Sequence, residues 1–102
     1  MYKILITTSN NSDILKMIAK DCILEKKLSP CAHLIDKSNS FYIWNGDYIC
    51  EDEYILAIKC KAGDTEKISD IINAKHNYEI PEIISINFNI ASKKYKEWFD
   101  KK

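Results

Sequence analysis

The stretch "FYIWNGDYI", Phe41–Ile49, decides the fold of this chain. Asn45 and Gly46 stand between two runs that are rich in aromatic and β-branched residues. A two-residue type I′ turn needs a positive φ at both central positions, and Asn followed by Gly adopts that backbone at little cost. The stretch therefore predicts a β-hairpin whose two strands leave the turn in opposite directions.

The strands of this hairpin are expected to be long. Apolar and polar residues partly alternate from Cys31 to Trp44, and the return strand runs from Asp47 to Lys61. The acidic run "EDE", Glu51–Glu53, interrupts the pattern of the return strand. We interpret this interruption as a bulge or an exposed section.

The remaining segments place one strand and one helix on each side of the hairpin, followed by a terminal helix. The predicted bounds are a strand at Tyr2–Thr7, a helix at Asp13–Lys27 capped by Ser12 and stopped by Pro30, a helix from Asp64 or Thr65 to His76 or Asn77, a strand at Glu82–Phe88, and a helix at Ser92–Lys102. The order β-α-β-β-α-β-α predicts an α+β fold, the ferredoxin-like split βαβ arrangement with an antiparallel four-stranded sheet. The 102 residues fit one domain, 1–102.

Such a fold leaves one face of its sheet without helices. The return strand is nevertheless apolar on both faces, with Leu56 and Ile58 on one and Ile55 and Ala57 on the other. A large uncovered apolar face indicates association. We therefore expect partners of the same kind.

Composition argues against several classes of protein. Acidic and basic residues balance at fifteen each, and every basic residue is lysine, which is unlike a nucleic-acid reader with its excess positive charge and its arginines. No apolar run approaches the length of a membrane span, so no membrane partner is expected. Four cysteines without C-x-x-C spacing, and a start that lacks signal-peptide character, indicate thiols in the cytoplasm.

Segments spread over nearly the whole chain resemble the CutA family of divalent-cation tolerance proteins. They are Thr8, "IA" at Ile18-Ala19, "EKKLSPCAHLI" at Glu25–Ile35, "SFYIWNG" at Ser40–Gly46, Glu53 and Lys59, "HNYEIPEI" at His76–Ile83, and "YKEW" at Tyr95–Trp98. The resemblance implies a homotrimer of ferredoxin-like subunits, similar in architecture to PII-type signalling proteins. It also implies a non-enzymatic role in the response to divalent metal ions.

Copper, or another divalent metal, is the ligand that the resemblance implies. Copper-binding members carry a cysteine and two histidines at positions that are Thr7, Lys75 and His76 here, so the resemblance assigns metal binding to His76. The stretch around His76 is first a structural joint, in which the histidine closes a helix, Asn77 provides a left-handed stop and Pro81 precedes a strand.

A second candidate metal ligand is Cys31. With an unbroken hairpin register, Cys31 lies opposite Cys60 and His33 lies two residues along on the same face. Two thiols and an imidazole suit Cu(I) or Zn(II). A bulge at "EDE" would instead shift the register by one residue and send Cys60 to the other face. The alternative for these residues is packing at the trimer surface.

A further set of residues is predicted at an inter-subunit cleft or interface. It comprises Tyr42, Trp44, Glu53, Lys59, Tyr78, Pro81, Glu82 and Trp98. Tyr and Trp are enriched at association surfaces, which favours interface packing, and a cleft for a small anion or a partner protein is the alternative function. With two glycines and no phosphate loop, nucleophile elbow or H-E-x-x-H, the sequence does not favour an enzyme.

Overall fold

The computed structural model describes residues 1–101 and has the predicted element order. The elements are β1 (Tyr2–Ser9), α1 (Ser12–Lys20), the π-helical turn η1 (Asp21–Glu25), β2 (Cys31–Trp44), β3 (Asp47–Lys61), the short 3₁₀ turn η2 (Ala62–Asp64), α2 (Thr65–Lys75), β4 (Ile84–Phe88) and α3 (Lys93–Asp100). The sheet is antiparallel with strand order β2-β3-β1-β4. The predicted α+β, ferredoxin-like fold is confirmed. Lys102, predicted to end the last helix, lies outside the described residues.

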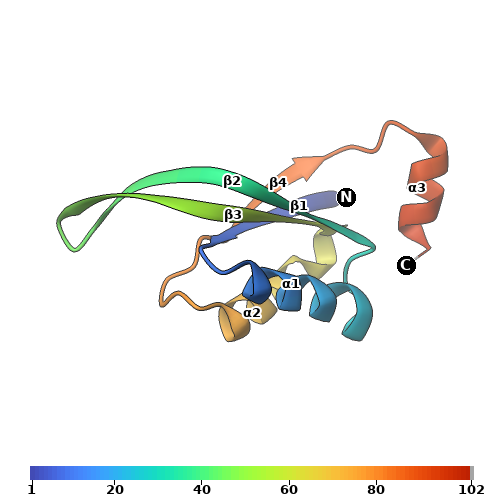
Figure 1. Cartoon of the computed structure of the whole chain (residues 1–102). Helices are drawn as coiled ribbons and strands as arrows, with labels where there is room; N and C mark the ends of the chain where they lie inside the picture. Colours follow the sequence, from blue (N-terminus) through green and yellow to red (C-terminus); the bar gives the residue numbers. More distant parts are fainter. Residues whose placement is uncertain (102) are drawn as a thin grey trace.

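Helices α1 and α2 cover one face of the sheet (Figure 1). The core lies between them and this face, and it consists of the buried residues Leu5, Leu15, Ile18, Cys22, Leu56, Ile58, Cys60, Ile68 and Ile72. We call the opposite side of the sheet the open face. Alternation along the strands puts Ile6, Ile35, Ile55, Ile84 and Ile86 there.

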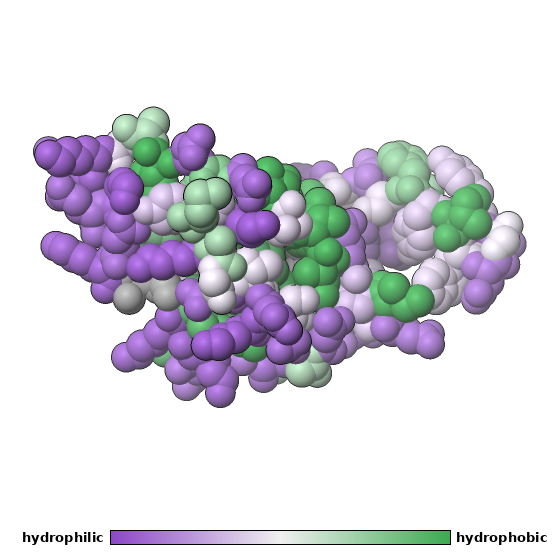
Figure 2. Space-filling model, turned by 180° about the vertical axis from the view of Figure 1, so that it is seen from behind, coloured by the Kyte–Doolittle hydropathy of each residue, from purple (hydrophilic) through white to green (hydrophobic). Residues whose placement is uncertain are grey.

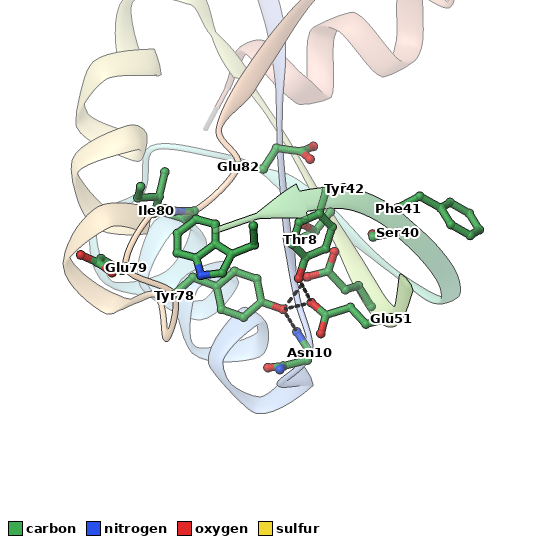
Figure 3. Close-up of a pocket in the computed structure, with 13 residues that line it drawn as sticks. Thr8, Asn10, Ser40, Phe41, Tyr42, Glu51, Tyr78, Glu79, Ile80 and Glu82 are labelled. Carbon is green, nitrogen blue, oxygen red and sulfur yellow. Dashed lines mark hydrogen bonds between the residues drawn. The ribbon is translucent and has the colours of Figure 1, made fainter. Parts of the chain in front are cut away.

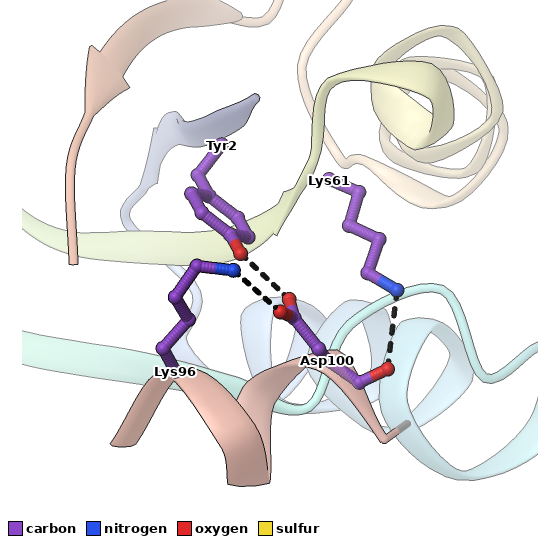
Figure 4. A network of polar contacts seen from close by, with 4 residues as sticks. All are labelled: Tyr2, Lys61, Lys96 and Asp100. Carbon is purple, nitrogen blue, oxygen red and sulfur yellow. Dashed lines mark hydrogen bonds and ion pairs between the residues drawn. The ribbon is translucent and has the colours of Figure 1, made fainter. Parts of the chain in front are cut away.

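The open face carries α3 only at the end away from the hairpin turn (Figure 1). There Phe99 is fully buried and packs edge-on against Tyr2. Asp100 ties the helix to the sheet, because its carboxylate accepts hydrogen bonds from the Tyr2 hydroxyl at 2.7 Å and from Lys96 at 2.9 Å (Figure 4). Lys61 adds a bond to the backbone carbonyl of Asp100. Helix α3 therefore docks on the sheet of its own subunit.

The β2–β3 hairpin extends past the helices, and its backbone turn is of the predicted kind. Asn45 and Gly46 both have positive φ, 49° and 84°. The molecule measures 46 × 26 × 21 Å, and the hairpin accounts for much of its long axis (Figure 1). Because no helix reaches the tip, apolar side chains there stay exposed on both sides of the ribbon. Figure 2 shows hydrophobic surface at this end.

The bulge in the hairpin lies on β2, whereas the sequence placed it at "EDE" in β3. The register shifts between Ile35 and Ser38, where Lys37 has a φ of 61°. The extra residue in β2 changes the pairing, so Cys31 lies opposite Lys59 and not opposite Cys60. An unbroken register, and with it the pairing of Cys31 with Cys60, is therefore wrong.

Several predicted boundaries differ by a few residues. Asn11, not Ser12, caps α1, because its side chain accepts from the backbone N–H groups of Asp13 and Ile14. The helical segment ends in η1 before a left-handed Lys27, so it stops ahead of Pro30. Strand β4 begins at Ile84 and α3 at Lys93. Asn77 is not among the residues with positive φ, so the left-handed stop predicted there is wrong.

Candidate functional site

A cleft of about 620 Å³ lies on the open face, at the hairpin end of the sheet. Three segments form it: the end of β1, the hairpin strands, and the loop that joins α2 to β4. The lining residues are Thr8, Asn10, Ser40, Phe41, Tyr42, Trp44, Glu51, Glu53, Tyr78, Glu79, Ile80, Pro81 and Glu82. Figure 3 shows that Tyr78 reaches from the loop towards Glu51 and Asn10, so its hydroxyl joins all three segments.

The buried Glu53 and the half-buried Tyr78 form the floor of this cleft. Glu53 is only 5% exposed, and the Tyr78 hydroxyl donates to its carboxylate in a short hydrogen bond. The same hydroxyl accepts from the backbone N–H of Asn10 at 2.8 Å. Burial, followed by the bond to Glu53, raises the pKa of Tyr78 well above its ordinary value. Tyr78 therefore stays a neutral phenol that donates to the carboxylate.

Glu51 and Tyr42 form a second, more exposed pair on the hairpin. The Tyr42 hydroxyl donates to Glu51 Oε1 at 2.7 Å. This bond raises the pKa of Tyr42 to about 12. Glu51 and Glu53 are two residues apart on β3, so both side chains point to the same face. The two carboxylates thus lie on the same face of β3, each with a tyrosine hydroxyl bound to it.

The loop that carries Tyr78 is held in place by His76. The ring atom Nδ1 accepts from the backbone N–H of Tyr78 at 3.0 Å. A neutral imidazole has one donor and one acceptor nitrogen, so Nε2 carries the proton and donates to the Thr8 carbonyl at 2.7 Å. Asn77 adds to this joint by accepting from Ser9 Oγ at 2.6 Å. The predicted role of this stretch as a structural joint agrees with these contacts.

The role of His76 as a metal ligand stays a prediction, and its contacts show what metal binding would require. Both ring nitrogens already have backbone partners, so a metal could bind only after one of these bonds breaks. Thr7, at the position where copper-binding relatives were expected to carry a cysteine, is fully buried on the helix side of β1, whereas Thr8 faces the cleft. Among residues 1–101, no group of three or more His, Cys, Asp or Glu side chains is arranged to hold a metal.

Cys31 as a metal ligand also stays a prediction. Its sulfur lies 3.7 Å from Nε2 of His33 on the same strand. Opposite it stands Lys59, which is not a usual ligand for a transition metal at neutral pH. The pair therefore offers two ligands from one copy, and a closed metal site would need further ligands from elsewhere.

Six of the predicted cleft residues do line the cleft: Tyr42, Trp44, Glu53, Tyr78, Pro81 and Glu82. Lys59 and Trp98 do not. Lys59 Nζ lies 3.2 Å from the Tyr95 hydroxyl and 5.3 Å from the centre of that ring, which places it beside α3. Trp98 is on α3 and packs against Tyr95. These two residues belong to the other end of the open face.

Sequence reasoning missed the rest of the lining as a group: Thr8, Asn10, Ser40, Phe41, Glu51, Glu79 and Ile80. Strand alternation could have identified Glu51, because it shares a face with Glu53. Thr8 stands in the family pattern but was given no role. Asn10 contributes through its backbone N–H, for which the side chain gives no sequence signal.

Comparisons with known sequences point to a single family. The sequence profile of the family described as "CutA1 divalent ion tolerance protein" matches residues 3–102. The chloroplastic protein CutA of Arabidopsis thaliana is 33% identical over 76 residues, which cover 74% of this chain and 42% of that protein. The divalent-cation tolerance protein CutA of Thermus thermophilus is 24% identical over 98 residues, covering 96% of this chain and 94% of that one. This chain thus spans nearly all of the bacterial relative and less than half of the plant one.

Solved structures agree with this result over almost the full chain. The periplasmic divalent cation tolerance protein CutA from Archaeoglobus fulgidus superposes with a TM-score of 0.90 at 27% identity, covering 99% of this chain and 97% of that one. CutA1 from Oryza sativa gives a TM-score of 0.89 at 26% identity, covering 98% and 91%. Sequence profile, relatives and fold all point to one family. The chain belongs to the CutA1 family of divalent ion tolerance proteins.

Proposed function

We propose that this protein is a non-enzymatic homotrimer that acts in tolerance of divalent metal ions. The observation that carries the assembly is the apolar open face. Ile35, Ile84 and Ile86 are each about half exposed there, at 49%, 48% and 48%. Apolar surface of this extent, on a sheet face that helices leave bare, is typical of an interface between subunits.

The hairpin supports a ring of copies. Its tip exposes Phe41 and Ile43 on the helix side of the ribbon, and their exposed fractions are 62% and 65%. This second apolar surface differs from the open face, so a contact in which the tip of one copy covers the open face of the next is heterologous. Heterologous contacts form closed rings when the rotation permits. Three copies is the number that the family resemblance implies.

Light scattering coupled to size exclusion tests the assembly at micromolar concentration. We expect a trimer for the wild type and smaller species for the double variant Ile84→Lys, Ile86→Lys, because two charges would then lie in the interface. Leu24→Lys is the matched control, since Leu24 is 58% exposed on η1, away from the open face. A monomeric wild type contradicts the proposed assembly.

We also propose that the protein binds metal ions weakly, with His76 and Cys31 as ligands. Titration calorimetry with Cu(I), Cu(II) and Zn(II) measures it. We expect Cys31→Ser to lower the affinity for Cu(I) at least tenfold, and Cys50→Ser, an exposed cysteine on the hairpin, to leave it unchanged. For Cu(II), His76→Ala is compared with His33→Ala. If no variant changes a measured affinity, both ligand assignments are wrong.

We propose that the protein resides in the cytoplasm. All four cysteines are thiols, and Cys22 and Cys60 lie in the core. Burial, followed by the charge of Asp21, raises the pKa of the Cys22 thiol to about 11, so this side chain is inert. Thiols of this kind suit the reducing cytoplasm. Among residues 1–101, no helix combines the length and the apolar character that crossing a membrane requires.

A second candidate function is favoured by the cleft itself. A volume of about 620 Å³ is within the usual range for small-molecule sites. We propose, as the alternative, a PII-like sensor or protein-anchoring scaffold that uses this cleft between subunits. The ligand expected from sequence was a small anion or a partner protein, but Lys59, the one cation in the predicted set, lies beside α3 instead.

A further inference from the structure

We propose that the cleft binds a small organic cation, an amine or quaternary ammonium with an apolar body. This inference rests on the second candidate function and names the class of its ligand. The first support is charge. Four of the lining residues are glutamates, Glu51, Glu53, Glu79 and Glu82, and the lining among the described residues includes no lysine. A nucleotide or other anion would be repelled, whereas a cation would be attracted.

The second support is the shape and chemistry of the walls. Tyr42, Trp44 and Tyr78 present aromatic rings from two different segments, and Ile80 and Pro81 add apolar surface. Aromatic faces attract cations through their quadrupole, and recognition of ammonium ligands by several such rings is the best-known use of this interaction. Glu53 at the floor, Glu51 at the rim and aromatic rings beside both fit a ligand that carries a positive charge on a carbon framework.

An inorganic ion fits the cleft less well. Hard divalent cations take six or more oxygen ligands at short distance. Glu51 Oε1 and Glu53 Oε2 already accept hydrogen bonds from Tyr42 and Tyr78. Residues 1–101 contain no group of three or more His, Cys, Asp or Glu side chains arranged around a metal. An organic ammonium needs no such cluster, because it interacts with the carboxylates by charge and with the rings by contact.

The two tryptophans make a direct measurement feasible. Trp44 lines the cleft, and Trp98 is on α3 at the other end of the open face. In the variant Trp98→Phe, Trp44 is therefore the sole source of tryptophan fluorescence. The probes are benzylammonium, benzyl alcohol and benzoate, which share a ring and differ in charge. We expect saturable changes in Trp44 emission with benzylammonium, at least fivefold weaker binding of benzyl alcohol, and no response to benzoate.

Glu51→Gln, made in the Trp98→Phe background, tests the carboxylate. The amide keeps one oxygen that can accept from Tyr42, replaces the other by an NH₂ donor and removes the negative charge, so the fold is expected to persist. We expect about a fivefold or greater loss of benzylammonium affinity. Glu97→Gln, an equal charge change on exposed α3, is the matched control and is expected to bind as the parent does. Equal affinity for all three probes, or no effect of Glu51→Gln, overturns the proposal.

The same samples are examined by light scattering, which separates this inference from the proposed assembly. A trimer that ignores benzylammonium contradicts the ligand alone, whereas a monomeric wild type contradicts the assembly. A lysine of a second copy is the other occupant with suitable charge. In that case Glu51→Gln would weaken the assembly and benzylammonium would produce no saturable signal, a result that also overturns the proposal.

Discussion

At the scale of single residues, Tyr78 makes the contact that holds the cleft together. Its hydroxyl bridges the buried Glu53 carboxylate and the backbone of Asn10, so two segments far apart in the sequence meet at one oxygen. The rim is different, because Tyr42 and Glu51 belong to the same hairpin and remain in contact with solvent. The floor should therefore matter for stability more than the rim.

Tyr78→Phe is expected to destabilise the protein by about 1–3 kcal/mol, since Glu53 would stay buried without its donor. Urea unfolding followed by circular dichroism measures the difference. Tyr42→Phe removes an equivalent hydroxyl from the exposed pair and should cost less than about 1 kcal/mol. Equal losses in the two variants would show that the floor has no special role.

Asp100 gives the protein a pH-dependent contribution to stability. Hydrogen bonds from Lys96 and Tyr2 lower the pKa of its carboxyl below the ordinary value of 3.8. A carboxyl whose pKa is lower in the folded state stabilises the fold above its unfolded pKa, and this contribution is lost as the pH falls through the folded value. We expect Asp100→Asn to flatten the fall in stability between neutral pH and about pH 2. Thermal unfolding over this range checks it, with Glu97→Gln as the control.

At the scale of elements, the hairpin shows why some features can be predicted from sequence and others cannot. The Asn45-Gly46 turn can be predicted from local sequence, because two adjacent residues determine its backbone conformation. The bulge beside Lys37 depends on how β2 pairs with β3, and local sequence does not specify that pairing. The same shift of one residue separates Cys31 from Cys60. The predicted cluster of two thiols and one imidazole therefore does not form within one copy.

The two glycines permit a matched test of the turn. Gly46 has a φ of 84°, and Gly63 lies outside the left-handed region; a Cβ at either would meet no atom within 4 Å. Gly46→Ala should therefore destabilise by roughly 1–2 kcal/mol through backbone strain alone. Gly63→Ala should be neutral or stabilising by up to about 1 kcal/mol, because it restricts the unfolded chain. Chemical denaturation compares the two. Equal effects would argue against strain in the turn.

Part of the cleft lining was predicted from the sequence, and geometry explains why other lining residues were missed or misplaced. Glu53 and Lys59 were both expected at one cleft or interface, and alternation along β3 does put them on the same face. Six residues of strand span about 20 Å, so sharing a face did not bring them together. Tyr42, Trp44 and Tyr78, which stand in the family's motifs, do line the cleft, whereas Trp98 does not. The contribution of the Asn10 backbone arises only when the loop folds back on β1.

At the scale of the whole molecule, the exposed apolar surface links stability to concentration. If copies cover the open face, the folded assembly is favoured by mass action, and the melting temperature depends on how much protein is present. We expect the midpoint to rise by about 5 °C or more over a hundredfold increase in concentration. Differential scanning calorimetry measures it. A midpoint that does not change would indicate that the monomer is the stable unit.

The central position of β1 has a consequence for the order of folding. This first strand pairs with β4 near the other end of the chain, as in the pair Tyr2 and Phe88. Its other neighbour is β3, so neither edge of β1 can be filled by the strand that follows it in sequence. During synthesis, the β2–β3 hairpin can form before β4, the second partner of β1, has left the ribosome. The sheet must therefore close late, through contacts of high sequence separation, which is the property that slows folding most.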